Sequence, residues 1–389
     1  MIGQRLKQLR LARGLSLEML AAEMGGVLTK QALSKYEQGK MQPSREIVHK
    51  LAFALKVKTT YLWSNSTVQI VAYRKGSRLS KKEQERIESV VWLALEERVR
   101  LQNIIQPDNG IDMPVQEMPV EKLDDAEVAA AKLRERWNLG VDPIANVTNM
   151  LEAHNVHVIE IDTSEKFDGI SALAQDESKQ NIAAAVVSRR SLPGERQRLS
   201  LIHELAHLVL KVSPRCDEEK VAFRFAAAFI APAQIVYHEI GTKRSFLQAQ
   251  ELLLLKRHLG ISVQALLYRL RDLGIITESY YKKWCIDISR LGWRKKEPLE
   301  IPCEKPVWLH RSLLRALSES VITQEEAQSM LGEDLDMVEP LSLIKRRAFM
   351  KLSLEDRRLI LTQQAEKMAA HYEEDSEWRD LGGGEVIEY

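Results

Sequence analysis

The stretch LIHELAHLVL, Leu201 to Leu210, constrains this chain more than any other. In a helix, His203 and His207 lie four residues apart, so both imidazoles leave the same face about one turn apart. Two ring nitrogens at that spacing can bind one zinc ion, and Glu204 beside them can take a proton from water at the metal. We therefore favour a zinc site here. The alternative is a surface helix that carries two solvated histidines.

A third ligand is available downstream, where Asp217, Glu218 and Glu219 begin the next predicted helix. A zinc site with two histidines commonly takes a carboxylate as its third protein ligand and leaves a fourth position for water. Glu219 is the preferred candidate, because Ala222 and Ala226 share its face and would let this helix approach the histidine helix closely. Glu218 points about 100° away and is the second candidate. The alternative is that these acids only complement the helix macrodipole.

Length and composition bound what the rest of the chain can be. The 389 residues exceed one ordinary core and predict roughly two to four domains. The three cysteines, Cys216, Cys285 and Cys303, form no CxxC pair, so we expect a reducing cytoplasm and no disulfide framework. The sequence shows no apolar run of about 18 residues and no signal-peptide pattern. The expected localisation is therefore cytoplasmic, with no membrane partner.

Residues 1–63 are basic, with eleven Lys and Arg against four Glu, which leaves a charge of +7. Their helical periods are short and well punctuated. The pattern predicts a helix over 2–12, a second one capped by Ser16, a third over 29–37 that ends at Gly39, and a fourth over 45–55. Two short helices joined by a tight turn that contains glycine predict a helix-turn-helix.

The stretch GLSLEMLAAEMGGVLTKQALSKYEQGKMQPSREIVHKLAFAL resembles the Cro/repressor (XRE) class of DNA-binding domain, and we assign residues 1–65 to it. Glutamine can read adenine with two hydrogen bonds, while lysine mostly contacts phosphate or guanine. The +7 charge agrees with DNA binding, and one such domain covers a half-site, so a homodimer is expected. The alternative is a bundle used only for protein contacts. Carried over by position, the resemblance implies that Thr29, Lys30, Gln31, Ser34 and Lys35 face the DNA.

Residues 66–120 are predicted to be a linker with one long helix over 80–103. The centre of that helix holds Trp92 and Leu95. Two interpretations stay open: a spacer that packs on the following domain, and a helix that joins two copies of the chain. Prolines and Gly110 between residues 106 and 119 indicate a domain boundary.

The histidine helix lies in a region that mixes helices and strands. Residues 123–137 and 143–154 predict helices, the second starting at Asp142-Pro143. The alternating, β-branched segment 156–161 and the segments 169–174 and 182–187 predict strands of a small sheet. We expect strand 169–174 to accept an extended substrate by addition at the sheet edge.

Three motifs, FDGISAL, RQRLSLIHELAHLVL and EEKVAFRFAAAFIAP, occur in an order and spacing that resemble the ImmA/IrrE metallopeptidases over residues 121–276. The resemblance implies a zincin-like fold with zinc bound by His203, His207 and Glu219, and with Glu204 as the general base. Mn²⁺ in place of Zn²⁺ stays open. Members of this family typically cut a repressor protein and so release a stress or mobile-element regulon.

Residues 277–345 are predicted to be a helical extension, either a packing element or a substrate-docking module. Residues 346–389 combine an amphipathic helix with an acidic run, seven acids and one Arg between Glu373 and Glu388. This tail resembles the C-terminal segment of small bacterial antitoxins, which implies a toxin as partner. The alternatives are a solvated acidic tail and a segment that folds back on the basic domain.

The sequence thus predicts a mostly helical α+β, multidomain protein: a helix-turn-helix domain, a linker helix, a zincin-like metallopeptidase domain with a small sheet, and a helical C-terminal region. The predicted function is that of a DNA-binding zinc endopeptidase, a regulator that senses stress and cleaves a transcriptional repressor. The alternative is a transcriptional regulator or antitoxin whose peptidase-like domain senses or binds a partner without cleaving. The intact HExxH motif favours the first reading, because a binding module has no chemical need for Glu204.

Overall fold

A computed structural model of the chain describes residues 2–63, 69–73, 79–105, 115–167, 169–176, 178–190, 192–331 and 349–374, with only the backbone described at 69–73 and 367–374. The chain forms two compact units, Met1–Gln324 and Glu325–Tyr389. The predicted boundary around Gly110 and most of the acidic run lie outside the described residues. The mostly helical α+β, multidomain architecture predicted from the sequence is confirmed.

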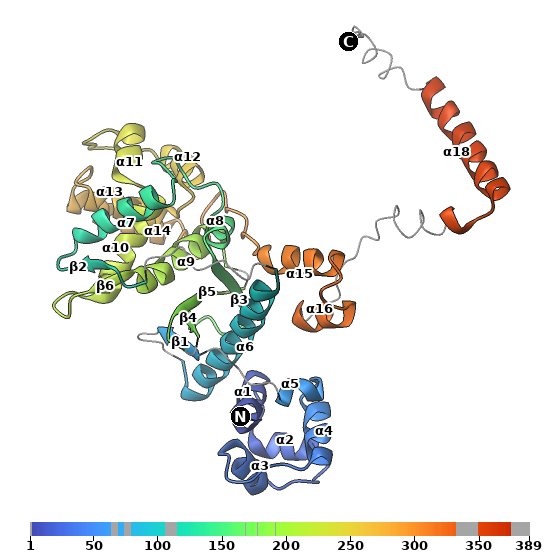
Figure 1. Cartoon of the computed structure of the whole chain (residues 1–389). Helices are drawn as coiled ribbons and strands as arrows, with labels where there is room; N and C mark the ends of the chain where they lie inside the picture. Colours follow the sequence, from blue (N-terminus) through green and yellow to red (C-terminus); the bar gives the residue numbers. More distant parts are fainter. Residues whose placement is uncertain are drawn as a thin grey trace. The chain divides into compact units, whose positions relative to one another are not determined.

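The N-terminal domain is a bundle of five short helices around a leucine core (Figure 1). Ser16, Thr29 and Ser44 each cap a helix, because their side-chain oxygens accept a hydrogen bond from the backbone N–H three residues on. Each cap of this kind contributes about 1 kcal/mol. Gly39 has a φ of 70° and ends the third helix as predicted. The helices are α1 (Ile2–Ala12), α2 (Leu17–Glu23), α3 (Lys30–Glu37), α4 (Arg45–Ala54) and α5 (Thr59–Trp63).

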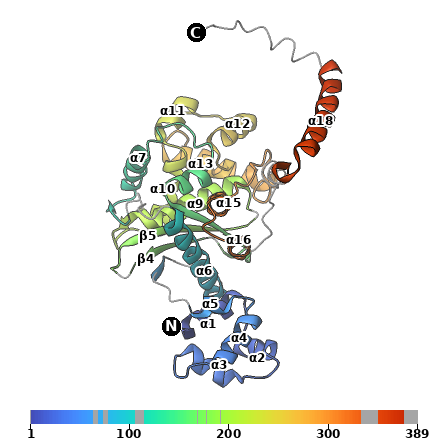
Figure 2. The same ribbon diagram turned by 45° about the vertical axis from the view of Figure 1, so that its right-hand side comes forward.

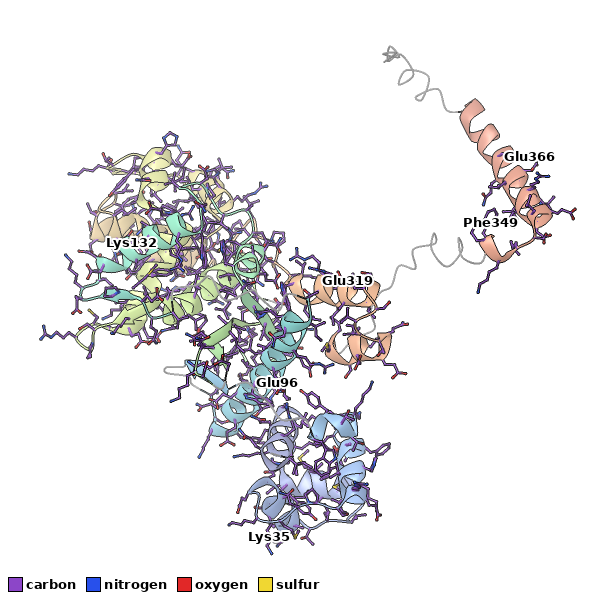
Figure 3. All side chains as sticks on the ribbon, viewed as in Figure 1. Lys35, Glu96, Lys132, Glu319, Phe349 and Glu366 are labelled. Atoms are coloured by element: carbon purple, nitrogen blue, oxygen red, sulfur yellow. The ribbon has the colours of Figure 1, made fainter. Side chains whose placement is uncertain are left out.

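Arg5 joins this bundle to the long helix α6 (Lys81–Ile105). The guanidinium lies 4.8 Å from the ring centres of both Tyr61 and Trp92 and forms an ion pair with Glu96. Figure 3 shows Glu96 on the part of α6 that meets the bundle. Because Arg5 is buried between two aromatic faces and a carboxylate, it fixes α1 on α6 through both charge and packing.

A four-stranded sheet forms the centre of the larger unit, in the order β1 (Gln69–Tyr73), β4 (Ile170–Gln175), β5 (Asn181–Arg189) and β3 (Val156–Ile161). β1 and β5 run antiparallel to β4, and β3 runs parallel to β5. One face of the sheet packs on α6 through Ile87, Val91, Leu95 and Val99. The other face packs on α9 (Gly194–Val209), the helix that carries the two histidines (Figures 1 and 2).

The long helix therefore packs on the sheet, as the spacer interpretation predicts. Its residues Ile87, Val91, Leu95 and Val99 are buried within one chain, so these four side chains are not available to a second copy. Dimerisation through another face of α6 stays a prediction. The segment predicted to be a linker also supplies strands. In addition to β1, it contains β2 (Met118–Val120), which pairs in parallel with β6 (Leu210–Val212) directly after α9. The five-part division of the chain stays a prediction.

The expectation that strand 169–174 offers a free sheet edge is wrong. β4 has β5 on one side and β1 on the other, with Tyr73 opposite Ser171 and Gln69 opposite Gln175. The error arose because β1 lies about a hundred residues away in sequence, in a segment whose composition indicates a linker. A second difference is small: the helix expected at 143–154 is α8 (Val147–Ala153), since the Asn146 side chain caps it.

Buried ion pairs attach a later segment, residues 297–304, to the start of α9. Lys256 is fully buried and contacts Glu195 at 2.7 Å and Glu297 at 3.0 Å. Arg198 similarly pairs with Glu304 at 2.6 Å. Buried charges are tolerated only when paired, so these contacts hold α9 firmly in place.

The remaining helices complete the two units. α10 (Glu218–Ile230) packs on α9 and on α7 (Asp125–Arg136). The first unit continues with α11 (Ala233–Ile240), α12 (Ala249–Leu259), α13 (Val263–Asp272), α14 (Glu278–Arg290) and α15 (Trp308–Ser318). The helix α16 (Gln324–Leu331) begins at the last residue of that unit and otherwise belongs to the second, which also contains α18 (Leu354–Glu374). Within the described ranges, no single helix has both the length and the apolar character to cross a membrane, and one bent pair, α10 with α11, passes that test by length and composition only.

Candidate metal centre

The two histidines of α9 face each other across one turn. The Nε2 atoms of His203 and His207 lie 3.3 Å apart, and their rings cross at 81°. Around these residues, Leu201, Leu205 and Leu208 are fully buried in the core shared with the sheet and α10. Burial of the apolar face thus fixes the rotation of α9 about its axis. Because His203 and His207 are four residues apart, both then lie on one face of the helix.

Glu219, in the first turn of α10, completes a group of three candidate ligands. Its Oε2 lies 3.2 Å from His203 Nε2, and its Oε1 lies 3.7 Å from His207 Nε2. A tetrahedral ion with Zn–N bonds of 2.0–2.1 Å holds neighbouring ligand atoms about 3.3 Å apart. The two nitrogens and the carboxylate lie within 4.8 Å of one another, so this donor set fits such an ion.

Small side chains on α10 allow this helix to lie close to α9. Ala222 and Ala226, one and two turns after Glu219, are buried against α9. Asp217 caps the helix by accepting a hydrogen bond from the Lys220 N–H and takes no part in the ligand group. Asp217 and Glu219 therefore have different roles, although they are only two residues apart: Asp217 caps α10, and Glu219 belongs to the group that could hold a metal ion.

Glu218, the second candidate ligand, has a different position from Glu219. Its Oε1 lies 3.1 Å from Nδ1 of His207, the ring nitrogen that does not face the ligand group. A carboxylate at that nitrogen fixes the tautomer and orientation of a ligating histidine and makes it a stronger donor. Sequence reasoning placed Glu218 in reserve as a ligand and missed this orienting position. The only sequence signal for this role was that Glu218 is an acid directly beside Glu219.

The hydrogen bond from His203 is the main cause that lowers the pKa of Glu219 below its ordinary value, and the nearby His207 acts in the same direction. Burial opposes this shift but does not cancel it. Glu219 is thereby kept as a carboxylate, the form that can bind a metal.

Glu204 lies on the same helix and is almost fully buried. Its carboxylate packs directly against Gly169, the residue before β4: a Cβ atom at Gly169 would lie 2.7 Å from Cγ and from Cδ of Glu204. Real Cβ atoms do not approach that closely, so any larger residue here would force the carboxylate to move. The glycine of the FDGISAL motif thus positions the candidate general base.

Phe223, one turn after Glu219, is a further residue at the site that the sequence did not single out. Its ring centre lies 4.2 Å from that of His203, yet 53% of the residue is exposed. An exposed aromatic ring against a candidate ligand histidine gives the site an apolar wall. The regular helical pattern of α10 gave no reason to treat Phe223 differently from a surface residue.

The candidate DNA-contacting residues cluster on α3 and at its start. Gln31, Lys35 and Lys30 are exposed, and Lys30 lies 3.0 Å from Glu18. Two hydroxyl groups already have local partners: that of Thr29 caps α3, and that of Ser34 accepts a hydrogen bond from Gln38. Figure 3 shows Lys35 at the end of the bundle remote from Glu96. The surface of α3 therefore remains accessible while α1 is docked on α6.

Comparison with known proteins agrees with these two structural parts. Residues 6–62 match a family described as helix-turn-helix, and residues 151–271 match one described as IrrE N-terminal-like domain. The chain is thus similar to XRE-type helix-turn-helix domains in its N-terminal part and to IrrE/ImmA-like domains in its central part. One relative is the SPbeta prophage-derived uncharacterized HTH-type transcriptional regulator YonR of Bacillus subtilis (strain 168).

The identity to YonR is 36% over 69 residues, which are 18% of this chain and 62% of the relative. The chain thus spans less than two thirds of the length of the relative that it matches. No solved structure matches the chain.

Proposed function

We propose that the protein is a DNA-binding, metal-dependent endopeptidase that acts as a regulator and cleaves a transcriptional repressor or a similar regulatory protein. The observation that carries this proposal is the convergence of His203, His207 and Glu219 beside a buried Glu204. Two imidazoles and one carboxylate form the donor set of zinc hydrolases. Zinc is the proposed ion, and manganese is the alternative.

The proposed chemistry is hydrolysis of a peptide bond. A metal ion bound by the three ligands would acidify water and polarise the scissile carbonyl. Glu204 takes a proton from the attacking water and passes it to the leaving nitrogen as the C–N bond breaks. Glu218 keeps His207 in the orientation that the ligand group requires, and Phe223 offers an apolar surface to a substrate side chain.

The consecutive acids at the start of α10 provide a direct test of the metal site. Glu219→Ala is expected to lose most of the metal affinity, because it removes a ligand. Glu218→Ala should lower the affinity by about 10- to 100-fold, because it removes only the partner of His207. Asp217→Ala is the matched control: it removes a helix cap and should leave the affinity unchanged.

Competitive zinc titration against a chromogenic chelator measures all three variants. Equal losses for Glu218→Ala and Glu219→Ala would contradict the assigned roles. A greater loss for Glu218→Ala would make Glu218 the ligand.

The proposed DNA partner is an operator bound through residues 1–65. The support is the exposed polar surface of α3 together with the +7 charge of residues 1–63. A homodimer is part of this proposal, since one domain covers only a half-site. Its interface would use a surface other than the buried stripe of α6.

Two substitutions on α3 should affect DNA binding in different ways. Gln31→Ala is expected to relax base preference by about 1–3 kcal/mol at one position. Lys35→Ala should weaken binding to all DNA sequences to a similar extent. It should also reduce the slope of log affinity against log salt concentration by about one. Lys132→Ala, an exposed charge on α7 away from the bundle (Figure 3), is the control.

The measurement is binding to DNA selected from a random pool by the full chain, at several salt concentrations. Binding that persists after residues 1–63 are removed would show that another part of the chain reads the DNA.

A second protein partner is proposed for the C-terminal unit. Its helix α18 leaves Leu354, Leu359 and Leu361 more than half exposed. Exposed apolar surfaces often mark sites of protein contact, and the acids that follow suit a basic partner such as a toxin. The test is whether a basic protein co-purifies with the full chain and is lost when α18 is removed.

A further inference from the structure

β1 pairs with the outer edge of β4, the strand that begins directly after the residue in contact with Glu204, the candidate catalytic carboxylate. Five consecutive residues of β1 pair antiparallel with β4, from Gln69 opposite Gln175 to Tyr73 opposite Ser171. Among the residues that the structure describes, β1 is the last strand on its side of the sheet and pairs with β4 alone. The chain itself therefore occupies the edge at which another extended polypeptide would bind.

The site lies at the end of β4 toward which β1 runs. Gly169 immediately precedes β4 and packs against the carboxylate of Glu204. Paired positions of β1 and β4 keep a constant register, so residue numbers rise along one strand as they fall along the other. A polypeptide that keeps this register would place the second residue after the Tyr73 position opposite Gly169, beside Glu204.

Pairing at this edge is a suitable way to hold a peptide for cleavage. Strand addition binds a chain through its backbone, so it accepts many sequences and fixes the extended form that brings one peptide bond to the catalytic groups. The other edge of the sheet belongs to β3, which is separated from β4 by β5. The β4 edge is thus the one that adjoins Glu204.

We propose that β1 is an internal competitor of the protein substrate: it pairs with β4 in the place of the substrate and must leave before a substrate strand can bind. The substrate class that follows is a segment able to become an antiparallel β-strand, such as an unfolded or locally opened linker. This inference rests on the proposed peptidase function and adds a control to it.

The position of β1 in the chain connects this control to the DNA-binding domain. Five residues separate Trp63, the end of α5, from Gln69, and seven separate Tyr73 from Lys81, the start of α6. Arg5 meanwhile docks the bundle on α6. Movement of the bundle on α6 would act on the strand through short connections, whereas the ligand group on α9 and α10 would be left unchanged.

The experiment compares three states of β1 in the full-length protein. Glu204→Gln is present throughout so that a bound peptide stays intact, and Cys216, Cys285 and Cys303 are replaced by Ser. Ala72→Cys with Ala172→Cys locks the strand by a disulfide, because opposed residues of an antiparallel pair have Cα atoms within disulfide range. Gln69→Cys with Gln175→Cys is a second lock at the half-buried end. Val71→Pro with Ala72→Pro weakens the strand, since successive N–H groups point to opposite edges and one of them faces β4.

The probe is a fluorescent peptide with the sequence of residues 69–78, QIVAYRKGSR, and its affinity is measured by anisotropy. The proline variant is expected to bind at least about tenfold more tightly than the parent, because apparent affinity scales with the fraction of molecules whose edge is free. The oxidised, locked protein should bind no peptide, and reduction should restore the parent affinity. The same peptide with both prolines is the matched control and should not bind.

Equal binding by oxidised and reduced protein would overturn the proposal. So would a proline variant that binds no peptide while its circular dichroism and melting temperature match those of the parent. Restoring Glu204 in the proline variant, with zinc added, then separates this inference from the peptidase function. A peptide that binds but stays intact supports competition by β1 and contradicts the peptidase. A protein that cleaves other chains at the same rate in the locked and open forms contradicts only the role of β1.

Discussion

Glu204→Gln is expected to abolish most peptide hydrolysis while the metal stays bound. The amide cannot accept a proton from water, and a positioned general base contributes about 100- to 10,000-fold to such reactions. His203, His207 and Glu219 remain in place, so metal content should not change. The measurement combines metal analysis of the purified protein with cleavage of a peptide library, with zinc or manganese present.

His203→Ala is the contrasting variant, because it removes a ligand and should lose metal and hydrolysis together. Undiminished cleavage by Glu204→Gln would refute the proposed mechanism. If neither the parent nor the variant cleaves anything, although both hold metal, the alternative gains support: a regulator that binds a partner or a ligand through a peptidase-like domain. This pair of variants therefore separates the two functions that the sequence left open.

Gly169→Ala is expected to lower hydrolysis by about 100-fold with little loss of stability. The new methyl carbon would lie 2.7 Å from Cδ of Glu204, so the carboxylate must move. A displacement of about 1 Å at a catalytic group costs rate on that scale. Stability changes less because the atoms that must shift belong to one side chain rather than to the backbone.

The φ angle of Gly169 lies outside the left-handed region, so alanine adds no backbone strain there. The measurements are the cleavage rate, the metal content and the melting temperature of the same preparation. Gly39→Ala, at a positive φ with open space around it, is the opposite control: it should lower stability and leave the site intact. Normal hydrolysis by Gly169→Ala would show that the contact with Glu204 does not position the base.

Much of the candidate site could be predicted from local sequence. The four-residue spacing of His203 and His207 brings their Nε2 atoms to 3.3 Å because helical geometry depends only on neighbouring residues. The same reasoning placed Glu219, with Ala222 behind it, on the face of α10 that meets α9. Patterns of this kind repeat within one or two turns and need no knowledge of the rest of the fold.

The residues that sequence reasoning missed all depend on contacts between distant segments. Glu218 contacts His207 from another helix, and Gly169, the residue before β4, contacts Glu204. Neither contact has a periodic signal, since each joins two elements whose relative position is set by the core. The different roles of Glu218 and Glu219 also depend on the directions of their side chains, which are defined only when α9 and α10 pack together.

The sequence by itself determined the helix-turn-helix bundle, the histidine helix and the α+β character of this protein, because caps, glycine turns and apolar periods act locally. Tertiary structure alone decided that β1 joins the sheet beside β4 and that α6 packs on both the sheet and the N-terminal bundle. Strand pairing uses backbone groups that every residue has, so a short strand in a linker does not reveal its partner in its sequence. The choice is made by the edge that the folded sheet leaves available.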